Sequence, residues 1–350
     1  MKVRDLLILV SIIGIVLMMV VPIPILVLDF LLIINISLAL IIILVAMNTK
    51  EALDFSIFPS LLLITTLFRL ALNISTTRNI LAKHEAGEVV ATFGSFVAEG
   101  NIVVGLVVFL ILVLVQFIVI TKGAERVAEV AARFTLDAMP GKQMSIDADL
   151  NAGMINEAQA RERRRKIEKE ADFYGAMDGA SKFVKGDAIA GIIILFINLI
   201  GGLIIGMTMA GMSFSEATTT FSVLTIGDGL VSQIPALLIS TAAGLIVTRA
   251  NSEGNLASDL AGQLFSYPKL LYIVAGTIVL LGTFTPIGIL RSYPIAIILF
   301  YAARRMTINL QRKLVEEEQK EEEQQIEEVR SPESVISLLQ VDPIEFEFGY

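Results

Sequence analysis

Five ionisable residues lie inside or beside long apolar runs of this sequence, where they could carry protons or form buried ion pairs. They are Asp29, Arg69, Asp187, Asp228 and Arg291. A charge at the centre of a membrane costs at least about 2.5–3.5 kcal/mol, so such side chains usually pair with one another or face a hydrated interior. We expect Asp29 and Arg291, close to the ends of apolar runs, to serve at the membrane interface or in turns.

Arg69 and Asp228 lie deeper in their apolar runs. Asn73 follows Arg69 by one helical turn, and Asp228 stands between Gly227 and Gly229. Two interpretations are open at this point. The two side chains form an intramembrane polar pair, or each faces a hydrated interior.

Asp187 is the strongest candidate for proton chemistry. It follows Lys185 and Gly186 and directly precedes an apolar run. In the structural interpretation, the carboxylate caps the start of a helix and accepts hydrogen bonds from free backbone N–H groups. In the functional interpretation, it exchanges protons at the membrane boundary and drives a conformational change in the adjoining loop.

The distribution of charge shows which elements must position these residues. Of the 27 Lys and Arg and 35 Asp and Glu residues, 24 lie within 122–187, half of each sign, and 18 lie after residue 303. The rest of the 350-residue chain carries too few charges to cover the surface of a globular fold with polar groups. We therefore predict a membrane protein with two polar segments.

Eight apolar segments are about as long as a membrane-spanning helix requires. They cover 6–24, 25–47, 57–81, 102–121, 188–210, 221–247, 270–286 and 287–303. Lys2 and Arg4 place the N-terminus in the cytoplasm, and an even number of spans returns the C-terminus to that side. The predicted fold class is an all-α polytopic membrane protein of about eight transmembrane helices, with a small helical cytoplasmic loop module and an acidic C-terminal linker.

This gives five regions along the chain: spans 1–4 (1–121), a charged cytoplasmic loop (122–187), spans 5–8 (188–303), an acidic linker (304–333) and the start of a further cytosolic domain that the sequence does not include (334–350). In the loop we expect a helix over 123–138, ended by Pro140 and Gly141, and a charged helical run over 154–173. That run is either a solvated helix or a docking surface. Gly202 and Gly206 form a small-xxx-small pattern for close helix packing, within one chain or between copies.

The composition also excludes classes of function. The chain has no Cys and one His, which excludes disulfides, thiol nucleophiles and Cys-ligated metals and argues against a multi-histidine metal site. The net charge of −8 argues against nucleic acid as a partner. The Asp147–Asn151 run lacks the Gly and Glu of a calcium loop, and Gly141-Lys142 lacks the other residues of a phosphate loop. We expect no enzyme activity, no cofactor and no metal.

Three long strings in and after the central loop carry a family resemblance. They cover 126–153, 171–191 and 224–237, and the first includes DAMPGKQMSIDADLNAG. They closely resemble the FHIPEP family, the export-gate membrane proteins of flagellar and virulence type III secretion systems, and their detail is closer to the flagellar members.

The resemblance implies a subunit of the protein export gate in the bacterial inner membrane, which couples the proton motive force to translocation of unfolded flagellar proteins. It assigns proton coupling to Asp187, and gate function to the loop residues Arg126, Arg133, Asp137 and Lys142. It also implies a homo-oligomeric ring of nine subunits. The implied partners are other export-gate membrane proteins, the cytosolic export ATPase complex and export chaperone–substrate complexes, the last two mainly through a cytosolic domain. Alternatives are a passive oligomeric membrane scaffold that presents docking domains, or the equivalent gate of a virulence system.

Overall fold

The computed structural model describes residues 3–98, 101–249, 267–284 and 288–329. The described residues form helices joined by short connections, and no strand occurs among them, so the predicted all-α fold is confirmed for this part of the chain. The chain divides into two units, residues 1–257 and 258–350, and each is described separately.

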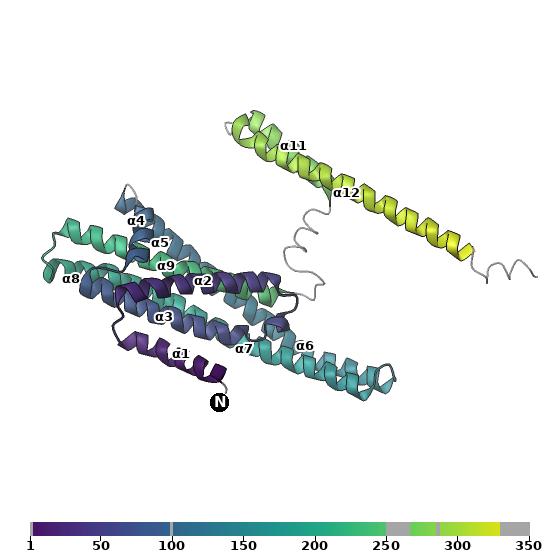
Figure 1. Ribbon diagram of the computed structural model, residues 1–350, viewed down its shortest axis with the longest axis horizontal. Helices are drawn as coiled ribbons and strands as arrows, with labels where there is room; N and C mark the ends of the chain where they lie inside the picture. Colours follow the sequence, from purple (N-terminus) through teal and green to yellow (C-terminus); the bar gives the residue numbers. More distant parts are fainter. Residues whose placement is uncertain (1–2, 99–100, 250–266, 285–287, 330–350) are drawn as a thin grey trace, which may run out of the picture. The chain divides into compact units, whose positions relative to one another are not determined.

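The first unit contains most of the helices (Figure 1). They are α1 (Val3–Val20), α2 (Ile25–Asn48), the 3-10 turn η1 (Ala52–Phe55), α3 (Phe58–Lys83), α4 (Glu88–Ala98), α5 (Ile102–Ile118), the π-helical segment η2 (Val119–Ala124), α6 (Glu125–Asn151), α7 (Glu157–Phe196), the π-helical segment η3 (Ile197–Gly201), α8 (Gly202–Thr208) and α9 (Phe214–Thr248).

The number of helices that could cross a membrane is lower than the sequence predicts. Within the part of the chain that the structure describes, four qualify by length and composition: α2, α3, the continuous helical run Glu157–Thr208, and α9. The pair α4 and α5, bent by 105°, makes a fifth if it counts as one broken span. Leu9–Val20 and Pro268–Phe284 are shorter apolar helices. The structure therefore supports a membrane protein with several apolar spans, and the count of eight is not confirmed.

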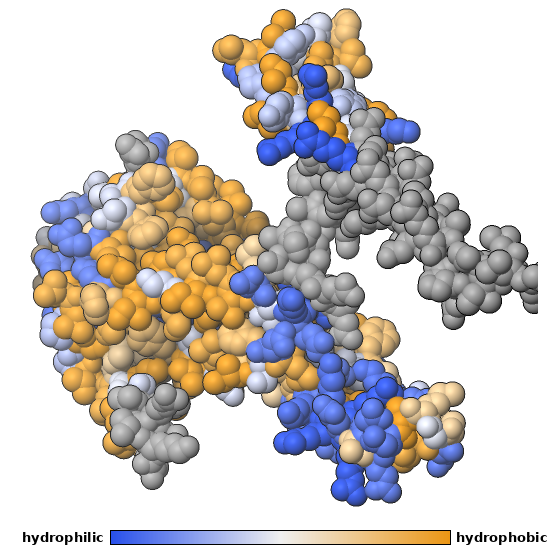
Figure 2. All heavy atoms as spheres, turned by 45° about the vertical axis from the view of Figure 1, so that its right-hand side comes forward, coloured by the Kyte–Doolittle hydropathy of each residue, from blue (hydrophilic) through white to orange (hydrophobic). Residues whose placement is uncertain are grey.

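Helix α9 lies at the centre of the first unit and packs against α2, α3, α4, α5, α7 and α8. The largest apolar cluster includes Phe58, Met177 and Ile239, from three different helices. The outer surface of this body is also apolar (Figure 2), with side chains such as Leu26 82% exposed. A helix bundle that is apolar both inside and outside is suited to a lipid environment.

Helices α6 and α7 form a hairpin that extends from the body and carries a mainly hydrophilic surface (Figures 1 and 2). The predicted helix end at Pro140 is wrong, because α6 continues through Pro140 to Asn151. The arms pack through a small apolar cluster that includes Ile146 and Ile167. Ion pairs link the arms: Lys142–Glu170 at 2.8 Å, Arg163–Asp149 at 3.0 Å, and Arg164–Asp147. The charged loop thus folds by pairing its own charges.

The second unit contains α11 (Pro268–Phe284) and α12 (Ile289–Val329), which pack against each other. Gly282 lies directly against Ser292, and the rings of Tyr272 and Phe300 meet edge to face at 5.2 Å. The predicted acidic linker begins within α12, whose described part ends at Val329. The predicted start of a further domain, 334–350, lies outside the described residues.

Candidate functional site

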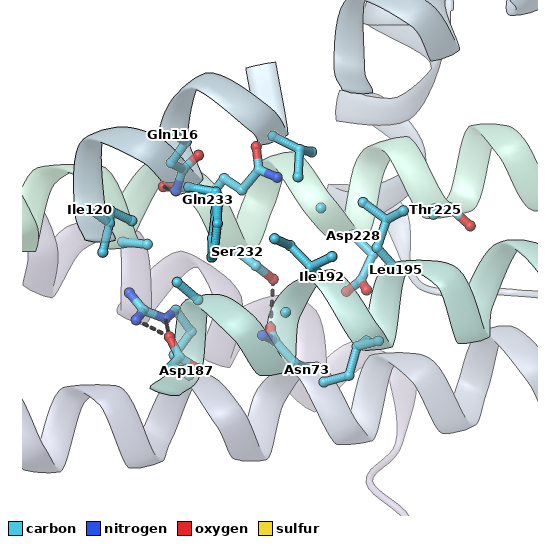
Figure 3. Close-up of a pocket in the computed structure, with 18 residues that line it drawn as sticks. Asn73, Gln116, Ile120, Asp187, Ile192, Leu195, Thr225, Asp228, Ser232 and Gln233 are labelled. Atoms are coloured by element: carbon cyan, nitrogen blue, oxygen red, sulfur yellow. Dashed lines mark hydrogen bonds and ion pairs between the residues drawn. The ribbon is translucent and has the colours of Figure 1, made fainter. Parts of the chain in front are cut away.

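A buried ion pair joins α3 to α7 inside the membrane body. Arg69 Nε donates to Asp187 Oδ2 at 2.7 Å, and Arg69 Nη2 donates to the same oxygen (Figure 3). The two side chains are only 3% and 4% exposed. In a low-dielectric interior each charge depends on the other for compensation.

Asp187 is not the cap of a helix, so the structural interpretation of this residue is wrong. Helix α7 begins 30 residues earlier at Glu157, where Asn156 Oδ1 accepts from the backbone N–H of Gln159 at 2.9 Å. The helix then runs unbroken from the hairpin into the body, past Gly186. The backbone N–H groups around Asp187 are therefore used within the helix, and its charge is compensated by Arg69.

Asp228 on α9 has a different partner. Asn198 Nδ2 donates to Asp228 Oδ2 at 3.0 Å, and the two residues are 0% and 5% exposed. Of the two interpretations left open for Arg69 and Asp228, the direct pair is therefore wrong, because Arg69 pairs with Asp187. The reason is the register of the helices: α3 and α9 run in opposite directions, so Arg69 and Asp228 lie on opposite sides of the contact between Asn73 and Ser232.

Both carboxylates nevertheless line one cavity of about 60 Å³ between α3, α5, α7 and α9 (Figure 3). Its polar lining consists of Arg69, Asn73, Gln116, Asp187, Thr225, Asp228, Ser232 and Gln233. Arg69 Nη1, Asp187 Oδ1 and Thr225 Oγ1 are buried and lack a hydrogen-bond partner within the protein. Buried polar atoms of this kind are usually satisfied by water, and one water needs about 10–15 Å³. The cavity is therefore suited to hold several waters.

Several neutral polar residues of this site were not singled out from the sequence. Ser232 Oγ donates to Asn73 Oδ1 at 2.5 Å, and Gln116 Nε2 donates to the backbone oxygen of Gln233 at 2.9 Å. Asn198 supplies the partner of Asp228. The signal that could have found them is an amide or hydroxyl side chain inside an otherwise apolar span, which also needs a partner.

One π-helical segment borders the cavity, and another contains the partner of Asp228. Segment η2 contributes Ile120 to its wall, and segment η3 contains Asn198. A π turn contains one more residue per turn than an α turn and so changes which side chains point inward; such turns are frequent at functional sites.

The loop residues implied by the family lie on the hairpin, outside the cavity. Arg126 pairs with Glu129 at 2.9 Å, and Arg133 approaches Asp137 at 3.8 Å, on exposed faces of α6. Lys142 pairs with Glu170 on α7 as described above. The structure therefore places all four residues on the hairpin, in separate ion pairs and apart from the pair formed by Asp187.

One ion pair links the start of α6 to the site. Lys185 Nζ donates to Glu125 at 3.0 Å, two residues before Asp187 on α7. This contact lies where the hairpin joins the body.

The remaining predicted residues have local roles. Asp29 on α2 accepts from the backbone N–H groups of Glu88 at 2.9 Å and Val89 at 3.1 Å, and so caps α4 across the chain. Gly202 and Gly206 both face the ring of Phe221 on α9, so both glycines pack closely against a helix of the same chain. Arg291 lies in the first turn of α12.

Comparison with known proteins identifies the family of this chain. The FHIPEP family model matches residues 15–350, nearly the whole sequence. The chain belongs to the FHIPEP family. Within it, the chain is 65% identical over all 350 residues to the flagellar biosynthesis protein FlhA of Bacillus subtilis. It is 57% identical over 243 residues to FlhA of Salmonella typhimurium, and 49% identical over 301 residues to the low calcium response locus protein D of Yersinia pestis.

These matches cover 100%, 68% and 85% of the chain, and 52%, 35% and 42% of the respective relatives. The chain thus spans about half the length, or less, of the FHIPEP proteins it matches. No solved structure matches it.

Proposed function

We propose that this chain is the membrane part of a flagellar type III export-gate subunit, which couples proton entry to the outward movement of unfolded flagellar proteins. The observation that carries the proposal is the buried Arg69–Asp187 pair at the point where α7 enters the body. The 65% identity to a flagellar biosynthesis protein supports the flagellar assignment.

The pair gives a physical route from a proton to a conformational change. When Asp187 binds a proton it loses its charge, and Arg69 loses the partner that compensates its own charge. The free-energy difference between two arrangements of α7 against α3 then depends on whether the Asp187 carboxyl is protonated. This dependence is what a proton needs in order to shift the population from one arrangement to the other. Because α7 extends unbroken from Asp187 back to Glu157, a displacement at the pair moves one arm of the hairpin.

The hairpin is the proposed output of the gate. Arg126, Arg133, Asp137 and Lys142 lie on it, where they can contact other components of the export apparatus. Proposed partners are further copies of the chain in a ring of nine, other export-gate membrane proteins, the cytosolic export ATPase complex and chaperone–substrate complexes, with the last two engaged mainly through a cytosolic domain.

The proposed setting is the bacterial inner membrane, with eight crossings and both termini in the cytoplasm. Lys and Arg residues around the apolar segments support this orientation. The hairpin then lies on the cytoplasmic side, and Asp187 lies near the cytoplasmic boundary of the membrane.

The test replaces Asp187 with Asn in the full-length protein. Export and motility should be lost, while membrane insertion and ring assembly, measured by blue native electrophoresis, stay at the wild-type level. Asp178→Asn is the matched control, since Asp178 lies on the same helix and bonds the exposed Lys182. Normal motility of Asp187→Asn would refute the proposal.

The alternative is a passive oligomeric scaffold that presents cytosolic docking domains. The two differ in proton flux through proteoliposomes that contain the purified full-length protein. Flux above a protein-free control that disappears in Asp187→Asn supports the gate, and flux equal to that control supports the scaffold. Complementation of a flagellar deletion strain, compared with a virulence-system deletion strain, distinguishes the two kinds of gate.

A further inference from the structure

The cavity contains two carboxylates that the proposed function does not connect. Asp187 faces it from α7 and Asp228 from α9, and Arg69 is the third ionisable residue of its lining. We propose that the cavity is a water-binding site that relays protons between Asp228 and Asp187 within a single subunit, with the Asn73–Ser232 pair as its central element. This inference rests on the proposed function and adds a path to it.

The separation of the carboxylates requires intermediates. Asn198, the partner of Asp228, lies eleven residues beyond Asp187, which is about 16 Å along the helix axis. That distance is far beyond a single hydrogen bond, so protons can pass only through groups between them.

The lining supplies such groups at the intermediate level. Asn73 follows Arg69 by one turn on α3, and its oxygen accepts from Ser232, one turn beyond Asp228 on α9. The Ser232 hydroxyl retains lone pairs and the Asn73 amide retains donors for water. Figure 3 shows this pair between Asp187 and Asp228.

Water is required at both ends by atoms that have no protein partner. Asp187 Oδ1 and Arg69 Nη1 are such atoms at one end, and Thr225 Oγ1 is such an atom near Asp228. The cavity volume of about 60 Å³ is several times the ~10–15 Å³ that one water needs. An internal chain of waters would satisfy these atoms and connect them.

The transfer balances as a displacement of one proton. The protonated Asp228 gives its proton to a water, each member of the chain passes one proton to the next, and the last gives a proton to ionised Asp187. Asp228 ends ionised and Asp187 ends neutral, and neutral Asp187 releases Arg69 as described above. The π turn at η3 has the role of holding Asn198 against Asp228.

The test compares two substitutions at Ser232, to Thr and to Val, whose side chains have the same shape as each other. Proton flux is measured with the full-length protein in proteoliposomes. Ser232→Thr keeps the hydroxyl and should keep the proton flux. Ser232→Val has the shape of the Thr variant without the hydroxyl and should reduce the proton flux about tenfold or more. Ser240→Val is the matched control, because Ser240 is a buried serine on α9 that lies outside the lining of this cavity. Equal flux from the Thr and Val variants would overturn the relay.

A second variant tests the waters without changing any polar group. Ala188 lines the cavity, so Ala188→Leu should exclude water and lower the flux while Ala190→Leu does not. Wild-type flux in Ala188→Leu would also overturn the relay. The two proposals fail differently. Absence of proton flux in the wild type refutes the proposed function. Flux that is present in the wild type, lost in Asp187→Asn and unchanged in Ser232→Val refutes only the relay.

Discussion

Arg69 of α3 and Asp187 of α7 are each other's only ion-pair partner among the described residues, and both side chains are almost completely removed from the surface. The two residues lie 118 positions apart in the sequence, and their ion pair joins α3 to α7 at the point where α7 enters the body. Its stability and its protonation are therefore connected: the same carboxylate that stabilises Arg69 is the group proposed to bind protons.

Removing one member of this pair should destabilise the protein more than removing both. Arg69→Leu leaves Asp187 as a buried charge without a partner, which costs about 3–5 kcal/mol, whereas the double variant Arg69→Leu/Asp187→Leu leaves no buried charge. The measurement is the unfolding midpoint of the purified protein in detergent. A double variant as unstable as Arg69→Leu would contradict this account of the pair.

Asp29 should be required for the stability of α4. Asp29→Ala removes the acceptor of two backbone N–H groups at the start of α4, a loss of about 0.5–2 kcal/mol. Asp29→Asn keeps one acceptor oxygen, so its stability should lie between that of the wild type and that of Asp29→Ala. Hydrogen exchange of the amides of Glu88 and Val89 reports the effect locally, and unchanged exchange in Asp29→Ala would show that the cap is dispensable.

The contact of α4 with α9 should depend on two glycines that allow close approach of the backbones. A Cβ on Gly227 would collide with the carbonyl oxygen of Val90, and one on Gly94 would collide with that of Val223. Gly227→Ala should lower the free energy of unfolding by about 1–3 kcal/mol.

Gly244 provides the control for this contact. It lies on the same helix as Gly227, and an added Cβ there would meet nothing within 4 Å. Gly244→Ala should leave the unfolding midpoint unchanged or raise it, since Ala is the better helix former by about 0.8–1 kcal/mol. Equal losses at the two positions would mean that close packing is not the reason for Gly227.

Arg133 and Asp137 should matter for contacts with partners and not for stability. Their side chains are 83% and 70% exposed and 3.8 Å apart, a geometry in which an ion pair contributes little. Arg133→Ala should change the free energy of unfolding by less than about 0.5 kcal/mol. Loss of export in a variant with a wild-type unfolding midpoint would place the role of Arg133 at an interface, and a large loss of stability would contradict it.

The sequence was sufficient for the membrane character, the all-α class and the charged region between the apolar segments. Each of these depends on local composition, because a run of about twenty apolar residues, or a dense run of charged residues, keeps its character wherever the chain folds. The resemblance to the FHIPEP family could also be recognised from the sequence alone, since the strings that carry it are continuous in the chain.

The tertiary structure alone decided which charges meet. Arg69 pairs with Asp187 and leaves Asp228 to Asn198, because the relative register of α3, α7 and α9 sets which turns lie level. Register follows from side-chain packing along whole helices, and no local pattern encodes it. Tertiary contacts also explain why α6 continues through Pro140 and α7 continues through Gly186: α6 packs against α7 in the hairpin, α7 packs against α3 in the body, and this packing outweighs the local preference of either residue to end a helix.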